Sequence, residues 1–270
     1  MESANNNPLL TLHPPPIPQN AVYTSCYCEE NIYLLAKTFQ EQSERDPQAF
    51  PWNVYVVFIS NSNKTVALWN QKHREDVVVW DYHVILVLRS SLSSTTVSKN
   101  DESEQLDVEP SSWVFDFDSQ LSAPCPGVDY FLGTFPYVVD STFGLSKSYI
   151  SSFRVVPART YLDQFASDRS HMIRRLEDGT GTYFSSPPPT YPPLCGVKAR
   201  AAGVTHNLMS AFVCMGPEQP QLVSRAEHVL TESQGVVDMV EQSGEDKHRG
   251  YGRVLSLDEF SGWLTHSSAS

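Results

Sequence analysis

The feature that most constrains the fold is a long, mostly apolar run from Val77 to Leu88. Two titratable residues, Asp81 and His83, lie near the middle of this run. A strand with one solvent-facing side alternates apolar and polar residues, whereas a strand covered on both faces is apolar at successive positions. The run therefore predicts a long buried strand within a sheet that is covered on both faces.

The segments before this run are predicted to form one helix and two strands. Residues 29–42 carry an apolar stripe at helical spacing, which indicates a helix with one buried side. Val54–Ile59 and Thr65–Trp69 are rich in β-forming residues, and the polar segment 61–64 between them is typical of a hairpin. The helical stripe consists of Ile32, Leu35, Ala36 and Phe39.

The segments after the run add further elements. Residues 113–118 alternate cleanly, with three aromatic side chains on one face and Val114, Asp116 and Asp118 on the other. Helical patterning returns around Arg159–Arg169, and residues 250–264 can close the fold as a strand and a short helix. One helix followed by an antiparallel meander predicts an α+β fold rather than a doubly wound sheet.

A chain of 270 residues with 40% hydrophobic residues can bury one good core. We expect residues 1–20, which contain runs of asparagine and proline, to form a disordered tail, and residues 21–270 to form a single catalytic domain. Two stretches are expected to be insertions. Residues 89–110 are rich in serine, threonine and acids, and residues 195–249 show only weak patterning. The proline-rich segment 185–193 is expected to be extended.

The formal net charge of −12 argues against nucleic acid or an anionic membrane as the main partner. No stretch is apolar enough for a membrane span, and the first 20 residues lack the features of a secretory signal. Five cysteines, an odd number without framework spacing, indicate a reducing compartment. We therefore expect a soluble cytoplasmic protein, with the nucleus as a second location.

Three residues form a candidate catalytic set. Cys28 lies where a loop meets the predicted helix start, and free N–H groups and the helix dipole favour a thiolate there. His83 is unusual within an apolar strand, and Asp116 lies on the polar face of another strand. A sulfur nucleophile needs an imidazole beside it and an acceptor that fixes the imidazole tautomer. Each residue alone is more often structural, but the three together indicate a cysteine hydrolase.

The residues alone leave several alternatives open. Cys26 is a second candidate nucleophile, and Asp118 shares the strand face of Asp116. Asp81 is a poorer candidate for orienting the imidazole, because it lies on the strand of His83 itself. A zinc site made by Cys26, Cys28, His83 and His171 is a weak alternative, since the C-x-C spacing is unusual and no second cysteine pair follows.

Several segments resemble the protein N-terminal glutamine amidohydrolases, in the same order along the chain from about Tyr23 to Phe260. The segments are Ser25–Asn31, Trp80–Val84, Asp116–Asp118, Phe165–Met172, Pro187–Pro192 and Gly250–Phe260. The resemblance implies a monomeric papain- or transglutaminase-like fold that needs no cofactor or metal. It also implies that the protein deamidates N-terminal glutamine in proteins or peptides and so supplies the arginine branch of the N-degron pathway.

The resemblance assigns the catalytic roles to Cys28, His83 and Asp116. Restriction to a chain terminus requires recognition of a free α-ammonium group, for which we consider Glu29, Glu30 and Asp168. Three rival functions use the same residues or the same substrate: another papain-like cysteine hydrolase, a transglutaminase, and a non-catalytic adaptor that binds N-terminal peptides. The backbone N–H of Cys28 is the expected oxyanion donor.

Overall fold

The computed structural model describes residues 13–91, 112–140, 143–216 and 250–265. Most of the predicted tail and insertions therefore lies outside the described residues. The helices are α1 (Cys28–Arg45), α2 (Gly127–Thr134), α3 (Ala158–Gln164), α4 (Val197–Ala201) and α5 (Leu257–Thr265), with 3-10 turns η1 (Pro136–Val138), η3 (Lys147–Tyr149) and η4 (Ser170–Met172) and a π-helical segment η5 (Leu208–Val213). The strands are β1 (Trp52–Ser60), β2 (Val66–Leu68), β3 (Val78–Trp80), β4 (His83–Ser90), β5 (Ser112–Phe115), β6 (Cys125–Pro126), β7 (Ser152–Pro157), β8 (Ile173–Arg175), β9 (Thr182–Phe184) and β10 (Arg253–Leu255).

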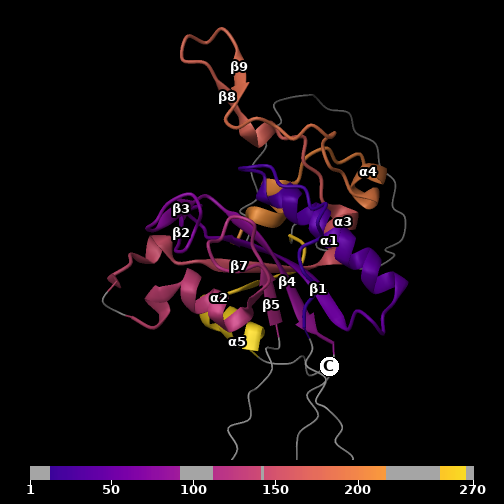
Figure 1. Cartoon of the computed structure of the whole chain (residues 1–270). Coiled ribbons are helices and arrows are strands. Elements are labelled where there is room, and N and C mark those ends of the chain that lie inside the picture. Colours follow the sequence, from indigo (N-terminus) through magenta and orange to yellow (C-terminus); the bar gives the residue numbers. More distant parts are fainter. Residues whose placement is uncertain (1–12, 92–111, 141–142, 217–249, 266–270) are drawn as a thin grey trace, which may run out of the picture.

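Six strands form one antiparallel sheet in the order β10-β7-β1-β4-β5-β6 (Figure 1). Side chains of α1, α3 and η5 form a hydrophobic cluster on one face of the sheet. Side chains of α2 and α5 form a second cluster on the other face. The predicted α+β class with an antiparallel sheet is confirmed.

The central strand β4 explains the apolar run. Val84, Leu86 and Leu88 belong to the cluster under α1, whereas Ile85 and Val87 belong to the cluster under α2. Successive side chains of a strand point to opposite faces, so a strand between two apolar layers needs apolar residues at every position. The prediction that this strand is covered on both faces is confirmed.

The predicted strand is nevertheless too long, and the predicted hairpin is wrong. The run 77–88 forms two strands, because the chain bends at Asp81 and Tyr82 between β3 and β4. The carboxylate of Asp81 accepts the backbone N–H of Tyr82, and the Ser60 hydroxyl donates to the Asp81 carbonyl. Strand β2 pairs with β3 in a separate small sheet, while β1 pairs with β4 and β7.

Other predicted elements are present with adjusted ends. Helix α1 covers the predicted helix, and β10 followed by α5 closes the fold as expected. Strand β5 ends at Phe115, so Asp116 and Asp118 lie just beyond it. Part of the stretch predicted as an insertion belongs to the core, since the side chains of Leu208, Phe212 and Val213 are buried in the α1 cluster.

The strands β8 and β9 form a hairpin that pairs with no other strand of the described chain (Figure 1). It projects from the end of the molecule near the start of α1, well away from the six-stranded sheet. All six strand residues are exposed. Among the residues that the structure describes, no helix has both the length and the apolar character needed to cross a membrane.

Candidate active site

The loop before α1 is fixed by its own hydrogen bonds. The backbone N–H of Thr24 donates to the side chain of Asn31 at 2.8 Å, and the Asn31 amide donates back to the Thr24 carbonyl at 2.9 Å. These two bonds tie the loop to the second turn of the helix. Within the closed loop Cys26 adopts a left-handed backbone with φ of 66°, and Cys28 is the first residue of α1.

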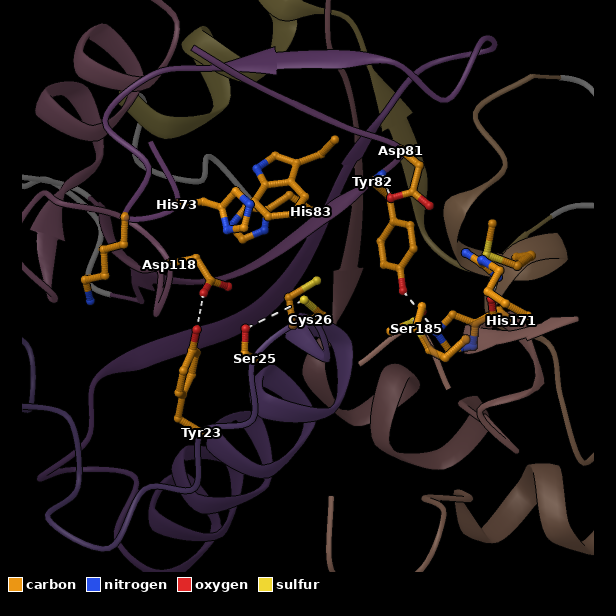
Figure 2. Close-up of a pocket in the computed structure, with 16 residues that line it drawn as sticks. Tyr23, Ser25, Cys26, His73, Asp81, Tyr82, His83, Asp118, His171 and Ser185 are labelled. Atoms are coloured by element: carbon orange, nitrogen blue, oxygen red, sulfur yellow. Dashed lines mark hydrogen bonds between the residues drawn. The ribbon is translucent and has the colours of Figure 1, made fainter. Parts of the chain in front are cut away.

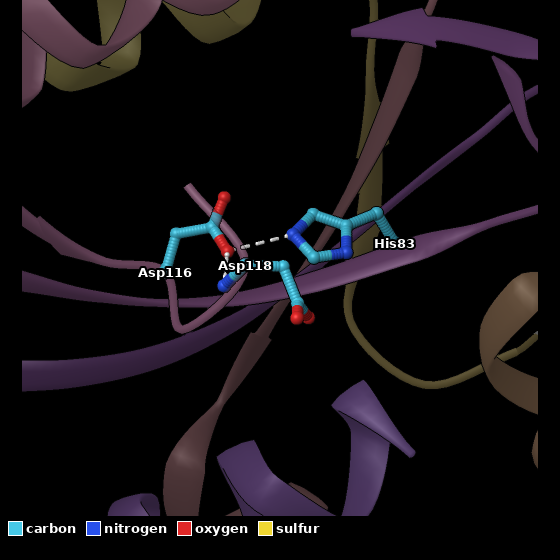
Figure 3. A group of neighbouring side chains, drawn as sticks. All are labelled: His83, Asp116 and Asp118. Carbon is cyan, nitrogen blue, oxygen red and sulfur yellow. Dashed lines mark hydrogen bonds and ion pairs between the residues drawn. The ribbon is translucent and has the colours of Figure 1, made fainter. Parts of the chain in front are cut away.

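His83 and Asp116 form a buried pair. The His83 Nε2 atom lies 2.9 Å from Asp116 Oδ1, and both side chains are almost fully buried (Figure 3). The other carboxylate oxygen of Asp116 accepts the hydroxyl of Tyr130 on α2 at 2.8 Å, and Oδ1 also accepts the backbone N–H of Asp118. Asp116 is therefore held from two sides, and its position fixes the orientation of the imidazole.

Each residue of the pair favours the charged form of the other, as the directions of their pKa shifts show. Burial lowers the pKa of His83, but the charge and hydrogen bond of Asp116 outweigh burial, and Asp118 adds to their effect, so the pKa rises above its ordinary value of 6.5. Burial raises the pKa of Asp116, but its bonds to His83, Tyr130 and the Asp118 backbone bring it below its ordinary value. These opposite shifts favour an imidazolium–carboxylate pair.

A cavity of about 380 Å³ lies where the start of α1 meets the start of β4 (Figure 2). Cys28 and His83 both line it, so the cavity brings the predicted nucleophile and the predicted base to one space. Because Asp116 occupies Nε2, the ring nitrogen left for a reacting group is Nδ1. The indole of Trp80 stacks on the His83 ring with an interplanar angle of 19°. The other lining residues are Tyr23, Ser25, Cys26, Lys72, His73, Trp80, Asp81, Tyr82, Asp118, His171, Met172, Arg174, Ser185 and Met209.

The electrostatic surroundings of Cys28 differ from the expectation. Burial raises the pKa of the Cys28 thiol well above its ordinary value, and the charges of Glu29 and Asp118 add to this rise. The backbone N–H of Val84 favours the thiolate, but its effect is smaller. The raised pKa runs against the prediction of a thiolate stabilised by the helix start, because desolvation and nearby carboxylates favour the thiol.

Glu29 links the thiol to a second histidine. The Cys28 Sγ atom lies 3.8 Å from Glu29 Oε2, which also accepts the Tyr82 hydroxyl at 3.1 Å. The other oxygen, Oε1, lies 3.3 Å from His171 Nε2. Glu29 is fully buried, while Tyr82 and His171 line the cavity. The carboxylate thus lies behind the cavity wall and acts on the sulfur from there.

The other two acids considered for the substrate ammonium are engaged elsewhere. Glu30 makes two 2.8 Å contacts with the guanidinium of Arg169, and both side chains are buried. Arg169 also donates to the carbonyls of Pro189 and Tyr191, so this ion pair anchors the proline-rich segment to α1. Asp168 pairs with His206 at 3.2 Å and is absent from the cavity wall.

The alternative residues Cys26, Asp118 and Asp81 also lie at the cavity. Cys26 lines the cavity as well, but it is exposed, and its sulfur lies 3.6 Å from the Ser25 hydroxyl. Asp118 also lines the cavity and accepts the Tyr23 hydroxyl at 2.5 Å (Figure 2). Asp81 is exposed on the cavity wall, and its Oδ1 atom accepts the backbone N–H of the next residue.

In the described part of the chain, one group of potential metal ligands comes together, and it consists of His83, Asp116 and Asp118 (Figure 3). Their ligand atoms lie within 4.8 Å of one another. Both oxygens of Asp116 and the Nε2 atom of His83 are already used in hydrogen bonds. This arrangement suits an imidazole held by a carboxylate better than a cation.

The sequence model of the N-terminal glutamine amidase family matches residues 23–263. The match includes the loop before α1, the His83–Asp116 pair and the strand that closes the fold. The chain belongs to the N-terminal glutamine amidase family. Family members are amide hydrolases, and the resemblance inferred from the sequence motifs is thereby confirmed.

Curated relatives with the name protein N-terminal glutamine amidohydrolase cover most of the chain. The protein from Danio rerio is 35% identical over 204 residues, which span 75% of this chain and 83% of the relative. The protein from Arabidopsis thaliana is 35% identical over 223 residues, spanning 80% and 86% of the two chains. The Bos taurus protein is 33% identical over 199 residues, spanning 73% and 79%.

Sequence reasoning missed several residues around the site. Tyr130 holds Asp116 from α2, a helix that the sequence analysis did not identify. Trp80 and Tyr82 precede His83 within the segment Trp80–Val84, but their spacing gave no indication that Trp80 stacks on the imidazole or that Tyr82 bonds to Glu29. The bond between Asp116 and Tyr130 could not be predicted from local sequence, because only the fold brings the two residues together.

Proposed function

We propose that this protein hydrolyses the side-chain amide of an N-terminal glutamine to glutamate and ammonia, and so prepares proteins for the arginine branch of the N-degron pathway. The observation that carries the proposal is the convergence of Cys28 and the His83–Asp116 pair on one cavity in a chain of this family. We further propose a single catalytic domain that acts as a monomer and has a papain- or transglutaminase-like fold, with the nucleophile on the first core helix and the other two residues on or beside the sheet.

In the first step, Cys28 Sγ attacks the side-chain carbonyl carbon of the glutamine, and its proton passes to His83. Because burial raises the pKa of Cys28, the proton leaves the sulfur as the bond forms rather than beforehand. The C–N bond then breaks, and the His83 imidazolium donates its proton to the departing ammonia. A glutamyl thioester on Cys28 remains.

In the second step, neutral His83 takes a proton from water, and the hydroxyl oxygen attacks the thioester carbon. The C–S bond breaks, and the proton returns to the sulfur, which releases glutamate. Asp116 stabilises the imidazolium in both steps and keeps Nε2 engaged, so that Nδ1 faces the reacting atoms. The backbone N–H of Cys28, at the start of α1, is the proposed donor to the oxyanion.

Selection of a chain terminus requires an anion for the α-ammonium group of the substrate. The acidic residues on the cavity wall are Asp81 and Asp118, whereas Glu29 and Glu30 are buried behind the wall. Asp118 lies beside the proposed triad, and its charge acts on both Cys28 and His83. We propose Asp118 as the residue that binds the ammonium group, with Tyr23 holding its carboxylate in place.

Ammonia release tests the function. Peptides that are identical except for an N-terminal Gln, Asn or acetyl-Gln are incubated with the protein. The proposal predicts rapid release from the Gln peptide alone. Comparable release from the acetylated peptide would contradict recognition of the terminus. Binding of the Gln peptide without ammonia release would identify an adaptor, and formation of an amide with an added amine would identify a transglutaminase.

A further inference from the structure

The hairpin β8–β9 is continuous with the wall of the cavity. Three residues of this region line the cavity: Met172 and Arg174 on the first side of the hairpin, and Ser185 on the second. The backbone N–H of Ser185 donates to the Met172 carbonyl at 2.8 Å, which extends the ladder of the hairpin to the cavity. The intervening pair, Ile173 and Phe184, does not line the cavity.

On the first side of the hairpin the lining residues Met172 and Arg174 flank Ile173, which does not line the cavity, and on the second side Ser185 lines it while Phe184 does not. Side chains at alternate positions of a strand share one face, and directly paired residues also share a face. Arg174 pairs with Tyr183, and the backbone of Leu176 bonds to that of Gly181 in the next step of the ladder. The face that begins in the cavity with Met172, Arg174 and Ser185 thus continues outward with Tyr183 and Leu176, and we call it the inner face.

The inner face offers groups that bind a polypeptide. Tyr183 is 50% exposed and Leu176 is 43% exposed, although neither belongs to a hydrophobic cluster of the described core. Arg174 Nη1 donates to the carbonyls of His171 and Ile173, which fixes the guanidinium, while Nε and Nη2 have no partner within the described residues. Fixed N–H donors next to apolar surface suit the carbonyls and side chains of an extended peptide.

We propose that the inner face binds the polypeptide that follows the N-terminal glutamine of the substrate. This inference rests on the proposed function, because a residue held in the cavity by its terminus must send the rest of its chain out along the wall. An extended chain advances about 3.3 Å per residue, so the inner face from Arg174 to Leu176 accommodates roughly two or three residues. The hairpin thereby makes affinity depend on the residues after the glutamine.

The test compares a short and a long substrate in two matched double variants. The short substrate is glutaminyl-glycine amide, which ends at the cavity, and the long one is a decapeptide with an N-terminal Gln and a leucine as third residue. Leu176→Ser with Tyr183→Ser removes two apolar side chains from the inner face. Ile173→Ser with Phe184→Ser removes two similarly exposed side chains from the opposite face.

For the inner-face variant we expect KM for the decapeptide to rise about tenfold, while kcat and the turnover of the short substrate stay unchanged. The opposite-face variant should keep the wild-type KM for both substrates. An unchanged KM for the decapeptide in the inner-face variant, or an equal rise in both variants, would overturn the inference. Failure of the wild-type protein to release ammonia from either substrate would instead refute the proposed function.

Discussion

His83 Nε2 lies 2.9 Å from Asp116 Oδ1, and Tyr130 holds the other oxygen of the same carboxylate from the opposite layer of the fold. A helix on one face of the sheet thus positions an imidazole that shares a cavity with a sulfur at the start of α1. Asp116 is buried and does not line the cavity, whereas the His83 side chain lines it.

The first prediction concerns the carboxylate that orients His83. An amide at position 116 cannot stabilise the imidazolium and can hold the wrong tautomer, so Asp116→Asn should lower kcat about 10³- to 10⁴-fold. Asp118→Asn is the matched control and should raise KM for the Gln peptide while costing far less in kcat. Steady-state ammonia release measures both. Equal losses of kcat in the two variants would show that Asp116 has no special role.

The second prediction concerns pH. The pKa of His83 lies above 6.5, and the mechanism needs neutral His83 to accept the thiol proton. The value of kcat/KM should therefore fall on the acid side with a midpoint above pH 6.5. The negative charge of Asp118 favours the imidazolium, so Asp118→Asn should move this midpoint to lower pH. A midpoint that stays the same or rises in the variant would contradict the electrostatic assignment.

The third prediction concerns Glu29 and the thiol. The Glu29 carboxylate lies 3.8 Å from Cys28 Sγ and raises the pKa of Cys28. Glu29→Gln removes this charge at nearly constant shape, so the thiolate fraction at neutral pH should increase. Alkylation of Cys28 by iodoacetamide, followed by peptide mass spectrometry in a Cys26→Ala background, should become several-fold faster. Slower or unchanged alkylation would show that the carboxylate does not act on the sulfur.

The fourth prediction concerns stability. Glu30→Gln leaves the buried guanidinium of Arg169 without its carboxylate, and the free energy of unfolding should fall by about 3–5 kcal/mol. Glu44→Gln breaks an exposed ion pair with Arg159 and should cost less than about 1 kcal/mol. Urea denaturation measures both variants. Similar small losses would mean that the Glu30–Arg169 pair does not anchor the proline-rich segment.

Much of the fold could be predicted from local patterns. The stripe of α1 and the unbroken apolar character of β4 reflect which neighbours cover each residue, and that information is local. The pairing of β1 could not be predicted in the same way. A polar four-residue segment between two β-rich runs favours a hairpin, but β1 finds its partners in β4 and β7, far along the chain.

The site shows the same division. Cys28, His83 and Asp116 were candidates from the sequence, but Cys26 and Asp118 stayed open until the family resemblance was used. The structure brings Cys28 and His83 to one cavity and bonds Asp116 to His83. The ionisation of Cys28 was predicted in the wrong direction. The helix start is visible in the sequence, whereas the burial of the sulfur and the inward orientation of Glu29 depend on packing.

The central claim is that Cys28 forms a thioester with the side chain of an N-terminal glutamine. The most direct measurement is rapid acid quenching of the protein with a Gln peptide, followed by mass spectrometry of the cysteine-containing fragments. The account predicts an adduct on Cys28 with the mass of the peptide less ammonia, present in Cys26→Ala and absent, together with ammonia release, in Cys28→Ala. Ammonia release that persists in Cys28→Ala, or an adduct on Cys26, would contradict it.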